Sequence, residues 1–83
     1  MDYAIYILFS QSCNKFYTGY TQALGNRINE HNAGETTSIK SCIPWSLIWK
    51  TEMPSRGEAM KLEKKIKARG AKRFLADLDI NFN

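Results

Sequence analysis

The stretch YAIYILF, residues 3–9, has the pattern of a strand in a β-sheet. Its residue types favour strands, and its side chains alternate between two faces. One face carries Tyr3, Ile5, Ile7 and Phe9, and the other carries Ala4, Tyr6 and Leu8. The polar residues SQSCNK that follow are turn material, and FYTGYT, residues 16–21, is typical of a second strand. The two strands are expected to form a hairpin.

The next segment, QALGNRINEHN at 22–32, predicts a short helix with Thr21 as its N-cap and Gly34 at its end. Residues 34–44 are expected to form a loop. The stretch WSLIWKTEM at 45–53 predicts a third strand that ends at Pro54. Strict alternation would place three of its side chains on one face: Trp45, Leu47 and Trp49.

Ser55 and Glu58 have the spacing of a capping box, which predicts the start of a second helix. Gly70 is expected to break this helix, and AKRFLADLDI at 71–80 predicts one more short helix that packs through Phe74, Leu75 and Leu78. The sequence therefore predicts an α+β fold in ββαβα order plus a terminal helix. A small three-stranded antiparallel sheet would be flanked by helices, within one domain over residues 1–83.

Composition limits the class of protein. The chain has 83 residues, of which 43 % are hydrophobic and 12 % aromatic, which suits one small ordered domain. No apolar run is long enough to span a membrane, and the first residues lack the pattern of a signal peptide, so a cytoplasmic location is expected. Cys13 and Cys42 fit reduced thiols in that compartment, with a disulfide left open. They are too few to indicate structural zinc.

The charge is distributed unevenly. The whole chain carries +4, but residues 56–73 hold eight basic and two acidic side chains, which gives this segment +6. Such asymmetry favours a polyanionic partner, although a solvated helix face produces the same pattern.

Glu63 occupies an unusual position in the predicted second helix. In AMKLEKKIK, residues 59–67, it falls inside the apolar stripe formed by Ala59, Leu62 and Ile66. Burying an unpaired carboxylate costs several kcal/mol, so Glu63 must reach solvent, pair with a cation or meet a ligand. A structural ion pair with Arg27 is one alternative.

The first predicted helix shows a similar pattern. Arg27 and His31 are neighbours at i and i+4 beside the inward stripe of that helix. Tyr6 lies on the sparser face of the first strand, and Tyr17 shortly precedes Gly19, where a ligand or another part of the chain can approach closely. Each residue alone has an ordinary structural explanation. Together with Glu63 they indicate a shared polar site.

These residues resemble the GIY-YIG nuclease domain family, particularly its small stand-alone bacterial members. The resemblance runs from about residue 3 to 74 and rests on AIY at 4–6, YTG at 17–19, Arg27 with His31, and the glutamate of SRGEAMKLEKKIK. Ala4 and Thr18 depart from the family pattern. Many members also have an asparagine beyond the glutamate, and Asn81 is too distant to be its counterpart.

The resemblance implies a divalent-metal-dependent endonuclease that hydrolyses phosphodiester bonds in DNA, with branched, damaged and single-stranded DNA all open. Glu63 would hold Mg²⁺ or Mn²⁺, Arg27 would bind phosphate, and Tyr6, Tyr17 and His31 would serve the attacking water or the proton transfers. The choice of general base stays open. The candidate nucleic-acid contacts are Lys15, Lys40, Lys67, Arg69, Lys72 and Arg73.

Three other interpretations are weighed beside this one. A nucleic-acid-binding module of the same fold with little or no turnover would not need the complete polar set. A protein-interaction domain would use the basic helix to bind an acidic partner. Trp45 and Trp49 would suit stacking on bases, although alternating strand positions more often place such residues in the core.

Overall fold

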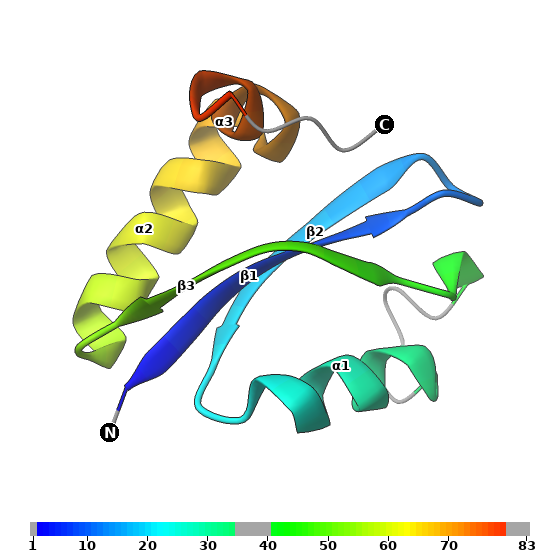
Figure 1. The fold of residues 1–83 in the computed structure, drawn as a ribbon, viewed down its shortest axis with the longest axis horizontal. Coiled ribbons are helices and arrows are strands. Elements are labelled where there is room, and N and C mark those ends of the chain that lie inside the picture. Colours follow the sequence, from blue (N-terminus) through cyan, green and yellow to red (C-terminus); the bar gives the residue numbers. More distant parts are fainter. Residues whose placement is uncertain (1, 35–40, 80–83) are drawn as a thin grey trace.

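The computed structural model describes residues 2–34 and 41–79, and it has the predicted order of elements (Figure 1). They are β1 (Tyr3–Ser10), β2 (Lys15–Thr21), α1 (Leu24–Asn32), β3 (Ser46–Met53), α2 (Arg56–Arg69) and α3 (Ala71–Asp77). The α+β prediction is therefore confirmed.

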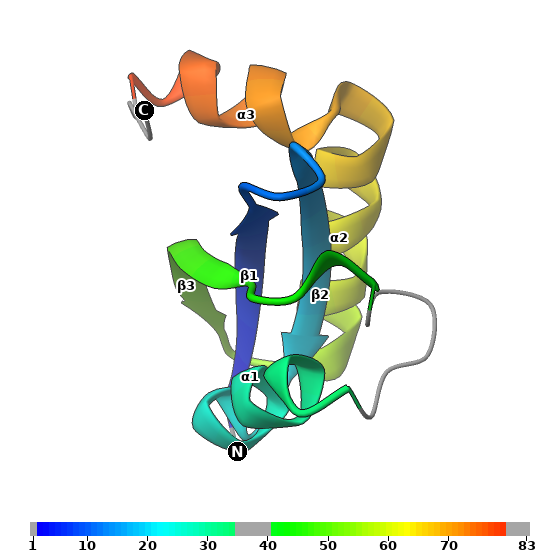
Figure 2. The ribbon, with the colours of Figure 1, turned by 90° about the vertical axis from the view of Figure 1, so that its right-hand side faces the viewer.

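The three strands form one antiparallel sheet in the order β2-β1-β3, so β1 is central and β2 lies at an edge. The alternation predicted for β1 is confirmed. Ile5 and Ile7 pack with α2 and α3 on one face, whereas Tyr6 and Leu8 face α1 on the other. Figure 2 shows α1 and α2 on opposite sides of the sheet.

The predicted face of β3 is wrong, because the register between β1 and β3 shifts. Ile7 is opposite Trp49, but the next residue of β1, Leu8, is opposite Leu47. At this point β3 has one extra residue relative to β1, so the side chains of β3 on the two sides of the irregularity alternate in opposite phase. Trp45 is consequently buried on the Tyr6 face, Trp49 packs on the opposite face, and Leu47 is 40 % exposed.

Cys13 and Cys42 form a disulfide, so the expectation of reduced thiols is wrong. The bond joins the β1–β2 turn to the segment that precedes β3, across a sequence separation of 29. Ser10 supports the same junction, because its hydroxyl donates a hydrogen bond to the Cys42 carbonyl at 2.6 Å. No local pattern in the sequence predicts that these two distant residues come together.

The start of α2 matches the prediction better than the start of α1. The Ser55 side chain accepts a hydrogen bond from the Glu58 backbone N–H at 3.2 Å, as expected for its N-cap. The predicted Thr21 cap is wrong. Helix α1 begins two residues later, after Ala23, and Thr21 Oγ1 accepts from the Ala23 N–H instead.

The last helix is shorter than predicted, and its packing differs at one residue. Phe74 and Leu75 pack on the core as expected, but Leu78 lies beyond the end of α3 and is 47 % exposed. Over the ranges 2–34 and 41–79, the helices are too short or too polar to cross a bilayer.

Candidate functional site

Tyr6 and His31 form a buried polar pair between β1 and α1. The Tyr6 hydroxyl oxygen lies 3.0 Å from His31 Nε2, and each residue is only 1 % exposed. Burial raises the pKa of Tyr6 well above its usual value of 10.0, and the neighbouring Tyr17 adds to this effect. Burial, with a smaller contribution from Arg27, lowers the pKa of His31. Both side chains are therefore uncharged near neutral pH.

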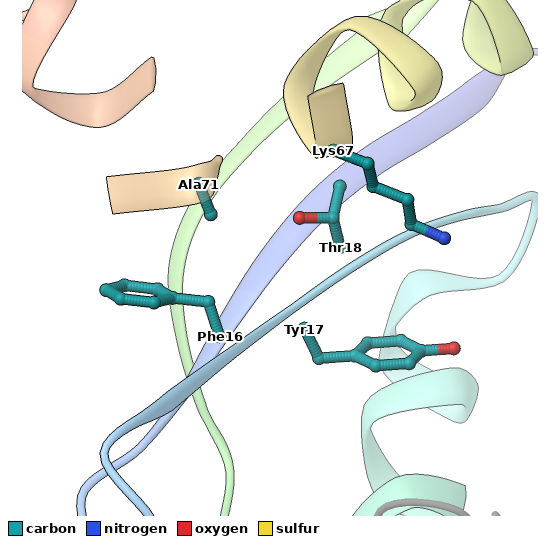
Figure 3. A pocket seen from close by; sticks show the side chains of 5 residues that line it. All are labelled: Phe16, Tyr17, Thr18, Lys67 and Ala71. Carbon is teal, nitrogen blue, oxygen red and sulfur yellow. The ribbon is translucent and has the colours of Figure 1, made fainter. Parts of the chain in front are cut away.

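Tyr17 packs beside this pair from the edge strand β2. Its ring centroid lies 4.9 Å from that of His31 and 6.3 Å from that of Tyr6. Unlike the other two rings it is partly exposed, and it lines a pocket of about 260 Å³ together with Phe16, Thr18, Lys67 and Ala71. Figure 3 shows Tyr17 and Lys67 extending in the same direction, with Phe16 pointing away.

Gly19 allows β2 to pass close to Tyr6. The two residues are opposite each other in the β1–β2 register. A Cβ atom at residue 19 would lie 2.6 Å from the Tyr6 hydroxyl oxygen and 2.8 Å from its Cζ, which is closer than real Cβ contacts. The close approach expected at this glycine is thus made by the Tyr6 ring. A larger residue would displace the hydroxyl that contacts His31.

Glu63 and Arg27 each have an ion-pair partner on their own helix. Glu63 is 19 % exposed and its Oε2 lies 3.7 Å from Lys67 Nζ on α2. Arg27 Nη1 lies 3.6 Å from Glu30 Oε1 on α1, with both side chains about half exposed. The anticipated Arg27–Glu63 structural pair is therefore replaced by two local pairs. The i, i+3 and i, i+4 spacings of these pairs are visible in the sequence.

Charged groups of α1 and α2 both influence the pKa of Tyr6, although the two helices cover opposite faces of the sheet. Arg27 lowers the pKa of Tyr6, whereas Glu63 and Glu30 raise it, and these effects are smaller than that of burial. Lys67, the partner of Glu63, lines a pocket with Tyr17 at edge strand β2. Of the five predicted site residues, Tyr6, Tyr17 and His31 are thus in mutual contact, whereas Arg27 and Glu63 are ion-paired on α1 and α2.

The predicted nucleic-acid contacts have different surroundings. Lys15, Lys72 and Arg73 are exposed. Arg69 is engaged with Asp77, because its Nε and Nη2 donate to the two carboxylate oxygens at 2.9 and 3.0 Å. Lys40 lies outside the described residues.

The site offers a small set of donors for a metal ion. Within residues 2–34 and 41–79, no group of three or more His, Cys, Asp or Glu side chains is arranged so that it could hold a metal ion. Glu63 is a partly buried carboxylate at the site. Mg²⁺ is commonly held through one or two carboxylates, with water and substrate phosphates completing its octahedron. Glu63 is therefore compatible with such an ion, provided that the substrate supplies further oxygen ligands.

The fold and this polar arrangement define a GIY-YIG nuclease domain. The family model described as "GIY-YIG catalytic domain" matches residues 2–74, so the chain belongs to this family. The chain is also similar to the UPF0213 protein BH0048 from Bacillus halodurans, known from a solution NMR structure, with 30 % identity and a TM-score of 0.60. The similarity covers 98 % of this chain and 88 % of that one. Among curated proteins, none matches.

Proposed function

We propose that this protein is a divalent-metal-dependent endonuclease that hydrolyses phosphodiester bonds in DNA. The observation that carries the proposal is the buried Tyr6–His31 pair beside the partly exposed Tyr17, whose pocket is also lined by Lys67, the ion-pair partner of Glu63. Membership of a nuclease family supports the reaction class. The net charge of +4 supports a polyanionic substrate.

Arg27 is the proposed ligand of the scissile phosphate. Its guanidinium is about half exposed, and its pairing with Glu30 at 3.6 Å is of the solvated kind that contributes little to stability. A phosphate oxygen can therefore replace the carboxylate at low cost. Because the fork of an arginine binds two oxygens at once, Arg27 also suits the charge that grows on the phosphate in the transition state.

The two tyrosines have different proposed roles, because only one of them is accessible. Tyr17 is partly exposed at a pocket and can orient the attacking water. Tyr6 is 1 % exposed and its pKa is raised, so it stays protonated and acts as a positioning residue. Its hydroxyl is hydrogen-bonded to His31 Nε2, and the His31 ring packs edge-on against Tyr17. The buried Tyr6–His31 pair thus fixes the position of the Tyr17 ring, which is accessible to solvent.

Glu63 is the proposed metal ligand, with Mg²⁺ or Mn²⁺ as the ion. The ion would replace Lys67 as the positive partner of this carboxylate, which explains why an acidic residue lies in the inward stripe of α2. When bound, such an ion supplies charge stabilisation to the phosphate oxygens and the leaving oxygen. Glu63 would hold this ion, and its present partner Lys67 lines the same pocket as Tyr17.

A nicking assay with matched variants tests this proposal. Supercoiled plasmid and a branched DNA oligonucleotide are incubated with the protein in Mg²⁺, Mn²⁺ or EDTA, alongside RNA of the same sequence. Glu63→Gln and Arg27→Ala are each expected to lower the rate by about 100-fold or more. Glu58→Gln is the matched control, because Glu58 is an exposed, ion-paired acid on the same helix. It should cleave at the parent rate.

Each other outcome has a definite meaning. Cleavage that survives both site substitutions contradicts the proposed site. Binding of DNA without cleavage under any metal condition indicates a binding module. Preferential cleavage of the RNA would replace DNA as the proposed substrate.

A further inference from the structure

Arg27 also lines a second groove, whose lining residues do not include Tyr6 or His31. Its volume is about 550 Å³, and its lining includes Tyr3, Tyr20, Gln22, Arg27 and Arg56. The end of β2 and the first residues of α1 and α2 lie at the same end of the molecule, which is where these residues come together (Figures 1 and 2). Arg27 therefore belongs both to the proposed catalytic site and to this groove.

The lining of the groove carries positive charge, of which that of Arg27 is partly balanced by its ion pair with Glu30 at 3.6 Å. Two arginines contribute to its lining, and its lining residues include no Asp or Glu. Glu58, the acidic residue in the first turn of α2, is paired with Lys61 at 3.9 Å. Arg56 is also the first residue of α2, where the backbone carries a partial positive charge that favours anions. The groove thus suits a phosphate group.

Aromatic side chains hold Arg56 at the groove. The Tyr20 side chain lies beside the Arg56 guanidinium in this groove and raises the pKa of Arg56. The Tyr20 ring in turn packs on Tyr3, with centroids 6.1 Å apart and planes tilted by 56°. A guanidinium held in this way loses less conformational freedom when it binds a ligand than an unsupported surface arginine does. The exposed faces of the two rings also offer contact area to a sugar or a base.

On the basis of the proposed nuclease function, we propose that this groove binds the DNA strand next to the scissile phosphate, with Arg56 as ligand of a flanking phosphate. Arg27 and Arg56 line one groove, so a single strand that presents one phosphate to Arg27 can continue along it. Tyr20 acts as a positioning residue for Arg56. The substrate must then extend beyond the cleaved bond on the side of this groove.

Binding measurements with a cleavage-deficient protein test this inference. In the Glu63→Gln background, the affinity for a labelled single-stranded oligonucleotide is measured by anisotropy at several salt concentrations. Adding Arg56→Gln should weaken binding about tenfold and reduce the slope of log K against log salt by about 1. Lys61→Gln is the matched control, because Lys61 is an exposed cation of the same helix outside the groove. It should leave the slope unchanged.

A second measurement identifies the phosphate that Arg56 contacts. Oligonucleotides carry one uncharged methylphosphonate at each position in turn. The parent should lose affinity when a phosphate flanking the cleavage position is neutralised, whereas Arg56→Gln should be insensitive at that one position. Tyr20→Phe, which keeps the ring but removes the hydroxyl, should show a smaller loss of affinity. Thermal unfolding of each variant confirms that it is folded.

The outcomes separate the inference from the proposed function. If Arg56→Gln binds like Lys61→Gln and keeps the methylphosphonate profile of the parent, the groove does not bind the strand and the inference is wrong. The nuclease proposal would still stand if the protein with Glu63 intact cleaves DNA. If the parent neither binds nor cleaves nucleic acid, both proposals fail.

Discussion

Replacing Gly19 by alanine should damage both stability and activity through one displaced atom. The added Cβ would lie 2.6 Å from the Tyr6 hydroxyl oxygen, whereas ordinary contact begins at 3.4 Å, so the hydroxyl must retreat by about 0.8 Å. Tyr6 is 1 % exposed and its hydroxyl contacts His31 at 3.0 Å. The retreat therefore strains the core and stretches this hydrogen bond.

The size of the effect follows from these contacts. Overpacking of a core costs about 1–3 kcal/mol, and a lost hydrogen bond costs about 1 kcal/mol. Replacing a strand glycine returns about 0.5–1 kcal/mol of backbone entropy. The net expectation is a loss of about 1–3 kcal/mol, and each kcal/mol lowers the melting temperature of a domain of this size by about 4–8 °C.

Thermal and urea unfolding with tryptophan fluorescence measure the loss. Gly25→Ala is the control, because a Cβ there meets nothing within 4 Å, and it should stabilise the protein by about 0.5–1 kcal/mol. In a Tyr6→Leu background, which removes the ring, Gly19→Ala should cost less than about 0.5 kcal/mol. An equal cost in both backgrounds would refute the assignment of the clash to Tyr6.

Three further predictions concern stability. Reducing the Cys13–Cys42 disulfide, which spans 29 residues, should cost about 3–4 kcal/mol in urea unfolding, and an unchanged midpoint would contradict this. The pKa of His31 is lowered in the folded protein, so the neutral ring contributes to the free energy of unfolding in full above about pH 6.5. This contribution is lost as the pH falls below that value. A His31→Gln variant should lack this component when stability is measured between about pH 7.5 and 5.5. Asn32→Ala removes hydrogen bonds at 2.7 and 3.1 Å to the Trp45 backbone and should cost about 1–3 kcal/mol in thermal unfolding, whereas parent-like melting would show that these bonds are dispensable.

Local periodicity was sufficient to predict the elements and their order, because each strand and helix repeats its apolar residues at its own period. It failed where one residue changes the register. The irregularity in β3 places Trp45 and Trp49 on opposite faces of the sheet, and no feature of the composition predicts it. The Cys13–Cys42 bond likewise depends on tertiary contacts between distant segments, which no local pattern reveals.

The candidate site shows the same division between local and tertiary information. Helical spacing indicated that Arg27, His31 and Glu63 differ from ordinary surface residues of their helices. It did not reveal that α1 and α2 cover opposite faces of the sheet. Nor did it separate the two tyrosines, because burial of Tyr6 and exposure of Tyr17 depend on how α1 packs over them.

Paramagnetic NMR with Mn²⁺ tests most directly whether residues from both faces of the sheet form one metal-binding site. A substoichiometric amount of Mn²⁺ added to the protein with a short DNA strand should broaden the signals of Glu63, Tyr17 and Arg27 together. The broadening should disappear in Glu63→Gln and persist in Glu58→Gln. Broadening that is confined to other residues, or that is unchanged in Glu63→Gln, would contradict a shared site at the β2 edge.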